Sequence, residues 1–273
     1  MTAHDVGMLV LLGHPVRQSV SPIFQNAALR AAGLALTYEA LDVGPGALGD
    51  RVRALVARRA AGNVTLPHKL AVAALCDTLT PLAKRAGAVN TFWVEQGALT
   101  GDNTDVGGFD ELARRVLGSI PLGARVAVLG AGGAAAAVLT AVERWPGAHV
   151  TLCNRTAERA DALAARFAVV DRIARRASDA VRDCTVVVNA TPAGMLDDAV
   201  PVDVALLPDA VGVIDLVHRA GDTPWVRSAK ARGLRAGDGL AMLVEQGALA
   251  FERWFGIEAP RAAMWEAVCD PPR

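Results

Sequence analysis

An apolar segment, Arg125–Leu129, runs directly into the glycine-rich turn 130–135, and this stretch constrains the fold more than any other. In its Gly-x-Gly-x-x-Ala pattern the first glycine permits a tight turn, the second lets the backbone approach a phosphate, and small Ala135 lets the next helix pack near the strand. The positive N-terminal end of that helix then faces the anion. A helix predicted at 134–144 and a strand predicted at His149–Cys153 complete a βαβ unit. The pattern therefore predicts binding of a dinucleotide through its pyrophosphate.

The end of the second strand indicates which dinucleotide binds. An enzyme that uses NAD usually places Asp or Glu there to hold the ribose hydroxyls, but this chain has Asn154, Arg155 and Thr156, with Arg159 one turn later. Hydrogen-bond donors and positive charge suit a ribose 2′-phosphate, so the sequence predicts NADP. The alternative is that Asn154 and Thr156 only cap the helix predicted at 157–167, with Arg155 a solvated charge.

Composition narrows the class of protein. At 273 residues and 52% hydrophobic content the chain is long enough for two compact domains, and its 28 basic and 28 acidic residues provide no basic face for nucleic acid. The arginine-rich stretches 51–59 and 172–182 are interpreted as solvated helix faces. No apolar run approaches the roughly 20 residues of a membrane span, and residues 1–5 lack the basic start of an export signal. We therefore expect a cytoplasmic protein that binds neither nucleic acid nor membrane.

The four cysteines and five histidines are scattered, without the spacing of a disulfide framework or a zinc site. No cluster of carboxylates accompanies the histidines, so we expect no catalytic metal. The cysteines are expected to be small buried apolar residues: Cys76, Cys153, Cys184 and Cys269.

Alternating strand and helix patterns predict an α/β protein of two domains separated by a cleft. Residues 1–105 are expected to form an open, mostly parallel substrate-binding and catalytic domain, and residues 106–239 a Rossmann-type NADP-binding domain. Residues 240–273 are expected to be helices that return to the substrate domain, and the hairpin predicted at 89–100 to form an antiparallel edge. The other predicted elements are strands at 8–13, 37–42, 63–66, 186–189 and 213–216 and helices at 22–32, 47–60, 70–76, 106–117, 240–255 and 261–268.

Polar residues gather where the strands of the first domain end, which is where ligands of open α/β sheets bind. Ser21 precedes Pro22 and is a favourable helix N-cap. Together with Ser19 it can also donate hydroxyl hydrogen bonds to a carboxylate at a positive helix end. These two roles predict a site for a small acid that needs no permanent cation.

Hydride transfer to a ketone leaves negative charge on oxygen, which needs a proton donor. Lys69 is the best candidate, and the carboxylate of Asp105 is suited to keep its amine charged and oriented. The alternatives are that Lys69 is solvated and that Asp105 only caps the helix predicted at 106–117. We expect His68 to be structural, because adjacent side chains on extended backbone point in opposite directions.

Eight separated motifs resemble, in order, those of the shikimate dehydrogenase family, and the resemblance covers nearly the whole chain. Four lie in the first domain: Ser19-Val-Ser-Pro22, Asn63-Val-Thr-Leu-Pro-His-Lys69, Gly87-Ala-Val-Asn-Thr91 and Gly101-Asp-Asn-Thr-Asp105. Four lie beyond it: Gly130-Ala-Gly-Gly-Ala-Ala135, Asn154-Arg-Thr156, Asn189-Ala-Thr-Pro-Ala-Gly-Met195 and Gly239-Leu-Ala-Met-Leu-Val-Glu-Gln246.

The resemblance implies reversible, NADP-linked reduction of 3-dehydroshikimate to shikimate in aromatic amino acid and chorismate biosynthesis, by a monomer or homodimer. It implies that Lys69 and Asp105 are catalytic. The residues expected to bind substrate are Ser19, Ser21, Thr65, Asn90, Asp105, His218 and Gln246. Those expected to bind the cofactor are Gly130, Ala131, Gly132, Gly133, Ala134, Ala135, Asn154, Arg155, Thr156, Arg159, Thr191, Leu216, Gly239 and Met242.

Three positions depart from the family pattern. His218 stands where the family commonly has Tyr, beside the place expected for substrate and nicotinamide; Val106 replaces a usual Gly, and Pro192 a small polar residue. Because imidazole is shorter than phenol and titrates near neutral pH, His218 leaves substrate preference open. The alternative functions are a dehydrogenase for quinate or a modified ring, and an NADP-binding sensor without catalysis.

Overall fold

The computed structural model describes residues 5–219 and 221–269, so residues 1–4 of the segment tested for an export signal lie outside it. The chain divides into two compact units. The first unit comprises Met1–Asp105 and Leu243–Arg273, and the second comprises Val106–Met242. Within the described ranges no helix is long and apolar enough to cross a bilayer.

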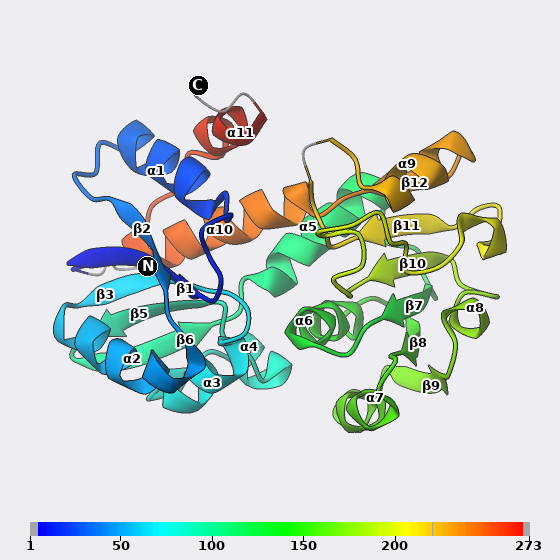
Figure 1. Cartoon of the computed structure of the whole chain (residues 1–273), viewed down its shortest axis with the longest axis horizontal. Helices are drawn as coiled ribbons and strands as arrows, with labels where there is room; N and C mark the ends of the chain where they lie inside the picture. Colours follow the sequence, from blue (N-terminus) through cyan, green and yellow to red (C-terminus); the bar gives the residue numbers. More distant parts are fainter. Residues whose placement is uncertain (1–4, 220, 270–273) are drawn as a thin grey trace. The chain divides into compact units, whose positions relative to one another are not determined.

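The described part of the first unit contains a six-stranded sheet, which comprises β1 (Met8–Gly13), β2 (Tyr38–Asp42), β3 (Ala60–Val64), β4 (Thr78–Leu79), β5 (Thr91–Glu95) and β6 (Ala98–Asp102). The strand order is β2-β1-β3-β5-β6-β4. Figure 1 draws this sheet, with β2, β3, β5 and β6 labelled. β1 is parallel to β2 and β3, β5 is antiparallel to β3 and β6, and β4 is parallel to β6. The hairpin therefore lies inside the sheet and the expected edge position was wrong, because the two residues of β4 carry too little pattern to predict a strand.

The helices of the first unit are α1 (Ser21–Ala31), the 3₁₀ turn η1 (Pro45–Ala47), α2 (Leu48–Ala57), α3 (Lys69–Leu75), α4 (Pro81–Ala86), most of α10 (Leu240–Phe255), and α11 (Arg261–Cys269). α1 packs against α11, far away in the sequence. α4 is absent from the predicted elements, although Thr80 caps it through its side chain and Pro81 follows, which is a typical start signal.

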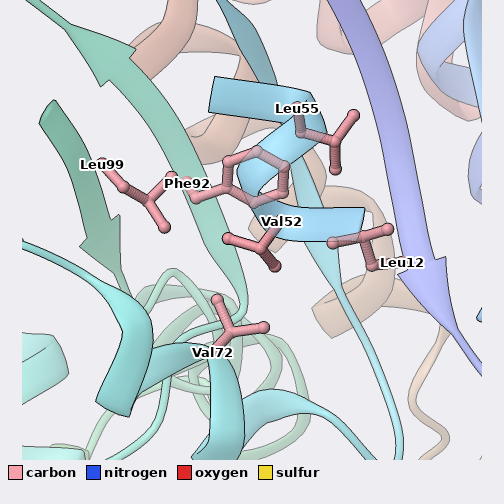
Figure 2. Close-up of a pocket in the computed structure, with 6 residues that line it drawn as sticks. All are labelled: Leu12, Val52, Leu55, Val72, Phe92 and Leu99. Atoms are coloured by element: carbon pink, nitrogen blue, oxygen red, sulfur yellow. The ribbon is translucent and has the colours of Figure 1, made fainter. Parts of the chain in front are cut away.

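Hydrocarbon side chains fill the space between this sheet and α2 and α3. Figure 2 shows six of them, which come from β1, α2, α3, β5 and β6 and face one another. The gap between them has no room for a water-sized sphere, and all six are buried: Leu12, Val52, Leu55, Val72, Phe92 and Leu99. This gap is a packing feature of the core, because a ligand site also needs polar groups to orient its ligand.

In the residues that the structure describes, the second unit also has a six-stranded sheet. Its strands are β7 (Arg125–Leu129), β8 (His149–Cys153), β9 (Val170–Ala174), β10 (Val186–Asn189), β11 (Gly212–Asp215) and β12 (Arg235–Gly237). Every pairing is parallel, in the order β12-β11-β10-β7-β8-β9. Numbered from β7, this is the order 6-5-4-1-2-3 of the Rossmann fold, which confirms the predicted fold class.

The helices of the second unit are α5 (Asp105–Leu117), which begins at the last residue of the first unit, α6 (Gly133–Val142), α7 (Ala157–Ala164), α8 (Ala177–Ala180), the 3₁₀ turn η2 (Val204–Leu206) and α9 (Pro224–Ala231). The sequence analysis expected a helix face at 172–182, but this stretch contains the end of β9 and the four-residue α8. Its arginines are nevertheless exposed.

The cysteines only partly follow expectation. Cys153 and Cys184 are buried, and burial raises the pKa of the Cys184 thiol to about 12. Cys76 is half-buried just after α3, and Cys269 is exposed at the end of α11, so the expectation of burial was wrong for these two.

Candidate active site

Lys69 and Asp105 are each the first residue of a helix, α3 and α5 respectively. Lys69 Nζ donates a hydrogen bond to Asp105 Oδ2 over 2.6 Å, and the two side chains are only 18% and 7% exposed. The start of a helix favours a carboxylate there, because the first N–H groups of a helix carry partial positive charge. The structure therefore brings together the two residues that the sequence analysis paired, and neither is a solvated surface charge.

Asn90 connects this ion pair to a distant helix. Its Nδ2 lies 2.9 Å from Asp105 Oδ1 and 3.1 Å from Oε1 of Gln246, a residue of α10. Its Oδ1 accepts a hydrogen bond from the backbone N–H of Thr104 at 2.7 Å. Asn90 is itself buried, so all of these bonds form away from water. One amide thus sets the positions of Asp105 and Gln246 together.

The two serines lie at the start of α1. The helix begins at Ser21, and its N-cap residue is Val20, which makes no side-chain cap bond, so the prediction that Ser21 is the N-cap was wrong. Ser19 Oγ instead accepts the N–H of Ser21 over 3.2 Å. A hydroxyl two residues before the helix thereby satisfies one of the N–H groups that lack an intrahelical partner.

Thr65 lies beside the segment that carries the serines. A Cβ built on Gly13, the last residue of β1, would lie 2.4 Å from Thr65 Cγ2 and 2.5 Å from Val16 Cγ1. The N–H of His14 also donates to the carbonyl of Leu66 at 2.9 Å. The carboxyl ends of β1 and β3 therefore lie side by side, and Gly13 has no space for a side chain between them.

His68 is structural, for a reason other than the one expected. It is buried, and its Nε2 lies 2.6 Å from the carbonyl oxygen of Val43. Its backbone is helical, with φ −91° and ψ −10°, rather than extended. Because a carbonyl only accepts hydrogen bonds, Nε2 carries the hydrogen and the ring fastens α3 to the segment after β2.

In the second unit, the glycine turn after β7 has two different geometries. Gly130 has a φ of +117°, and a Cβ there would lie 2.6 Å from the carbonyl oxygen of Ala190. At Gly132 a Cβ would meet no atom within 4 Å, and α6 begins at the next residue without a side-chain cap. The turn therefore leaves open space beside Gly132 at the start of a helix, and a helix start favours a phosphate.

The segment after β8 has no acid at the strand end itself, and its first acid, Glu158, lies in the first turn of α7 between two arginines. Arg155 and Arg159 are exposed, and Asn154 Nδ2 donates to the carbonyl of Thr156 at 2.9 Å. Thr156 is the N-cap residue of α7 by position, but its side chain makes no cap bond. The capping alternative is therefore not what the structure shows for Asn154 and Thr156.

A buried polar cluster holds the ends of β10 and β11. Asp215 accepts hydrogen bonds at 2.8 Å from Asn189 Nδ2 and at 2.8 Å from the Thr223 hydroxyl, and Asn189 Oδ1 accepts one from the Thr191 hydroxyl at 2.6 Å. Burial raises the pKa of Asp215, and its hydrogen bonds from Thr223, Val217 and Asn189 counteract the rise. Sequence reasoning gave Asp215 no role, although a polar residue that ends an apolar strand is the available signal.

Leu216, His218, Gly239 and Met242 follow this cluster. A Cβ on Gly239 would lie 2.2 Å from the carbonyl oxygen of Leu216, so only glycine fits against that strand end. Met242 is buried in the first turn of α10. Burial lowers the pKa of half-buried His218, and the charge of Asp238 only partly offsets this. Its imidazole is therefore neutral at pH 7.

Comparison with known proteins assigns the chain to a family. A model described as the shikimate dehydrogenase substrate-binding domain matches residues 11–92. Models described as shikimate/quinate 5-dehydrogenase and as the shikimate 5'-dehydrogenase C-terminal domain match residues 111–201 and 239–269. The shikimate dehydrogenase (NADP⁺) of Symbiobacterium thermophilum is 42% identical over 93% of this chain and 90% of its own.

Solved structures agree with the family models. Shikimate dehydrogenase from Aquifex aeolicus aligns with a TM-score of 0.91 at 34% identity, covering 99% of this chain and 100% of its own. Shikimate 5-dehydrogenase from Thermus thermophilus, in complex with NADP(H) and shikimate, aligns with a TM-score of 0.86 at 41% identity, covering 96% of this chain and 98% of its own. This chain belongs to the shikimate dehydrogenase family.

Proposed function

We propose that this protein catalyses the reversible, NADP-dependent reduction of 3-dehydroshikimate to shikimate. The observation that carries the proposal is the largely buried Lys69–Asp105 ion pair, which Asn90 connects to Gln246. The proposal also draws on the relative from Symbiobacterium thermophilum, which is named shikimate dehydrogenase (NADP⁺) and is 42% identical over 93% of this chain.

The residues of the second unit fit NADP. The sheet order places a switch point between β7 and β10, where dinucleotides bind in Rossmann folds. The open space at Gly132 lies at the start of α6, and Arg155 and Arg159 offer positive charge for the 2′-phosphate. When bound, the cofactor supplies a hydride to the ketone carbon or accepts one from shikimate. The residues proposed to hold it are the fourteen that the sequence analysis names for this purpose.

Lys69 is proposed as the proton donor. As the hydride arrives, negative charge develops on the ketone oxygen, and Lys69 Nζ gives that oxygen a proton; in the oxidation of shikimate Nζ receives it back. Asp105 keeps the ammonium oriented through the 2.6 Å bond. Both side chains are largely shielded from water, which strengthens their interaction with developing charge.

The substrate would be bound by hydroxyl and amide groups. Ser19 and Ser21 at the start of α1 are proposed to hold its carboxylate, because a helix N-terminus favours an anion. Thr65, Asn90, Asp105 and Gln246 are proposed to bind the ring hydroxyls, and His218 to contact substrate as a neutral imidazole. The choice of shikimate over quinate, the oligomeric state and the cytoplasmic location stay predictions.

Initial rates test the substrate and the cofactor together. We expect the purified protein to reduce NADP with shikimate faster than with quinate, and NADP to be preferred over NAD. A higher kcat/KM for quinate, or for NAD, would favour the quinate alternative, and no turnover with any of the four pairs would favour the sensor.

Replacing the proton donor separates chemistry from binding. Lys69→Ala is expected to lower kcat by about 10²–10⁴-fold while shikimate binding is largely kept, because the lost group acts mainly in the transition state. Steady-state kinetics and a shikimate titration measure the two effects. Lys84→Ala, at an exposed lysine of the same unit, is the control and should behave as wild type. Unchanged turnover in Lys69→Ala would remove the assignment.

The two glycines of the phosphate turn are expected to respond differently to alanine. Gly130→Ala places a methyl against the Ala190 carbonyl at positive φ and should cost more than about 1 kcal/mol in the free energy of unfolding. Gly132→Ala has space for its methyl, so its stability should stay near wild type while the Kd for NADP rises about tenfold, equivalent to about 1.4 kcal/mol. Urea unfolding and NADP titration check both; an unchanged Kd in Gly132→Ala would contradict the phosphate role.

The burial of His218 predicts a pH effect on stability. The folded protein resists protonating this ring, so the unfolded state takes up more protons once the pH falls below the ordinary histidine pKa of about 6.5. His218 therefore lowers the free energy of unfolding at pH values below its ordinary pKa, and this effect is absent at higher pH. Relative to wild type, the Tm of His218→Asn should rise as the pH falls from about 7.5 to about 5.5 in thermal unfolding. A Tm difference that is constant across this range would show that the ring is not buried as described.

A further inference from the structure

One face of α10 is hydrogen-bonded to the ends of two strands of the first unit. Gln246 and Arg253 are seven residues apart, close to two helical turns, and therefore lie on the same face. Gln246 bonds to Asn90 just before β5, and Arg253 Nε donates to Asp102 Oδ2 on β6 over 2.9 Å. Next to Arg253, the indole N–H of Trp254 donates to the Thr91 hydroxyl at 3.0 Å.

Asp102 is the buried carboxylate in this contact. It is 1% exposed, whereas the side chain of Arg253 is 40% exposed. Its second oxygen, Oδ1, accepts hydrogen bonds from the Thr80 hydroxyl and from the N–H of Asn103. Burying a carboxylate in this way is costly, and the positive charge of Arg253, 151 residues away in the sequence, offsets part of that cost.

The four residues from Asp102 to Asp105 are each held by a separate bond. Asn103 Nδ2 donates to the carbonyl of Ala88 at 2.9 Å, and the N–H of Thr104 donates to Asn90 Oδ1 at 2.7 Å. Asp105 accepts a hydrogen bond from Lys69 Nζ on Oδ2 and one from Asn90 Nδ2 on Oδ1. Hydrogen bonds therefore hold this segment at both ends, through Asp102 at its start and Asp105 at its end.

We infer that Arg253 and Asp102 are positioning residues, which hold the carboxylate of Asp105 where it orients Lys69 Nζ. This inference rests on the proposed function for its kinetic consequence and not for its geometry. When Arg253 is lost, Asp102 is left as a buried charge without its cation, and the turn toward Asp105 rearranges to let water in. A displacement of about 1 Å in a catalytic group is enough to lower a rate about 100-fold.

The same helix offers a matched control. Glu245 and Glu252 precede Gln246 and Arg253 by one residue each, and both bind Arg261 of α11. Arg261 thus stabilises α10 through a second row of side chains, without a hydrogen bond to β5 or β6 among the contacts described for it. An effect that arises only from loosening α10 should appear in both Arg253→Met and Arg261→Met.

The experiment compares Arg253→Met, Arg253→Lys and Arg261→Met with wild type for shikimate-dependent NADP reduction and thermal unfolding. We expect kcat to fall about 10–100-fold in Arg253→Met with the KM for NADP within about twofold, and to recover partly in Arg253→Lys. Arg261→Met should lower the Tm while kcat stays within about twofold of wild type. If Arg253→Met does not fold, the comparison of Arg253→Gln with Arg261→Met decides the question.

Crystal structures of the same variants provide a test that needs no turnover. In Arg253→Met, or Arg253→Gln if only that folds, the Lys69–Asp105 contact of 2.6 Å should lengthen or break, and in Arg261→Met it should be kept. An intact contact in the Arg253 variant, or an equal loss of kcat in the two methionine variants, would overturn the inference. Absence of activity in wild type would refute the proposed function, and the crystal structures would still decide the positioning role.

Discussion

Two opposite charges, Lys69 Nζ and Asp105 Oδ2, meet 2.6 Å apart where little water reaches either side chain. Desolvation is costly for both groups, so the pair persists only if its remaining hydrogen-bonding atoms also find partners. Asn90 provides one for Asp105, and Gln246 and Thr104 hold Asn90 in turn. The hydrogen bonds of Asn90, Gln246 and Thr104 therefore supply the partners that one buried ion pair requires.

The proposed ligand sites of the two units are built from different chemical groups. In the second unit the main features are backbone features: a glycine at positive φ, open space at Gly132, and the unpaired N–H groups of a helix start. In the first unit they are side chains from several elements joined by hydrogen bonds. This difference fits the proposed ligands, because backbone N–H groups and a helix dipole suffice for a pyrophosphate, whereas a substituted ring requires a donor or acceptor for each hydroxyl.

Buried carboxylates other than Asp105 organise loops in both units. Asp215 holds Asn189, which in turn holds Thr191, and Asp102 holds the start of the segment that ends at Asp105. Each is compensated differently: Asp215 by neutral donors, which leaves burial to raise its pKa, and Asp102 by the cation of Arg253. A carboxylate that bonds to several backbone or side-chain donors stiffens the loops that carry them.

Local pattern determined a large part of this protein. The Gly-x-Gly turn, the apolar strands β7 and β10 and the helix of Leu240–Phe255 could be predicted because each depends on periodicity or on backbone freedom within a few residues. Tertiary structure alone decided that β4 forms the sheet edge and that Arg253 neutralises Asp102. Contacts between separate elements, such as β4 with β6 or α10 with β6, depend on how whole elements pack, and no local sequence pattern carries that information.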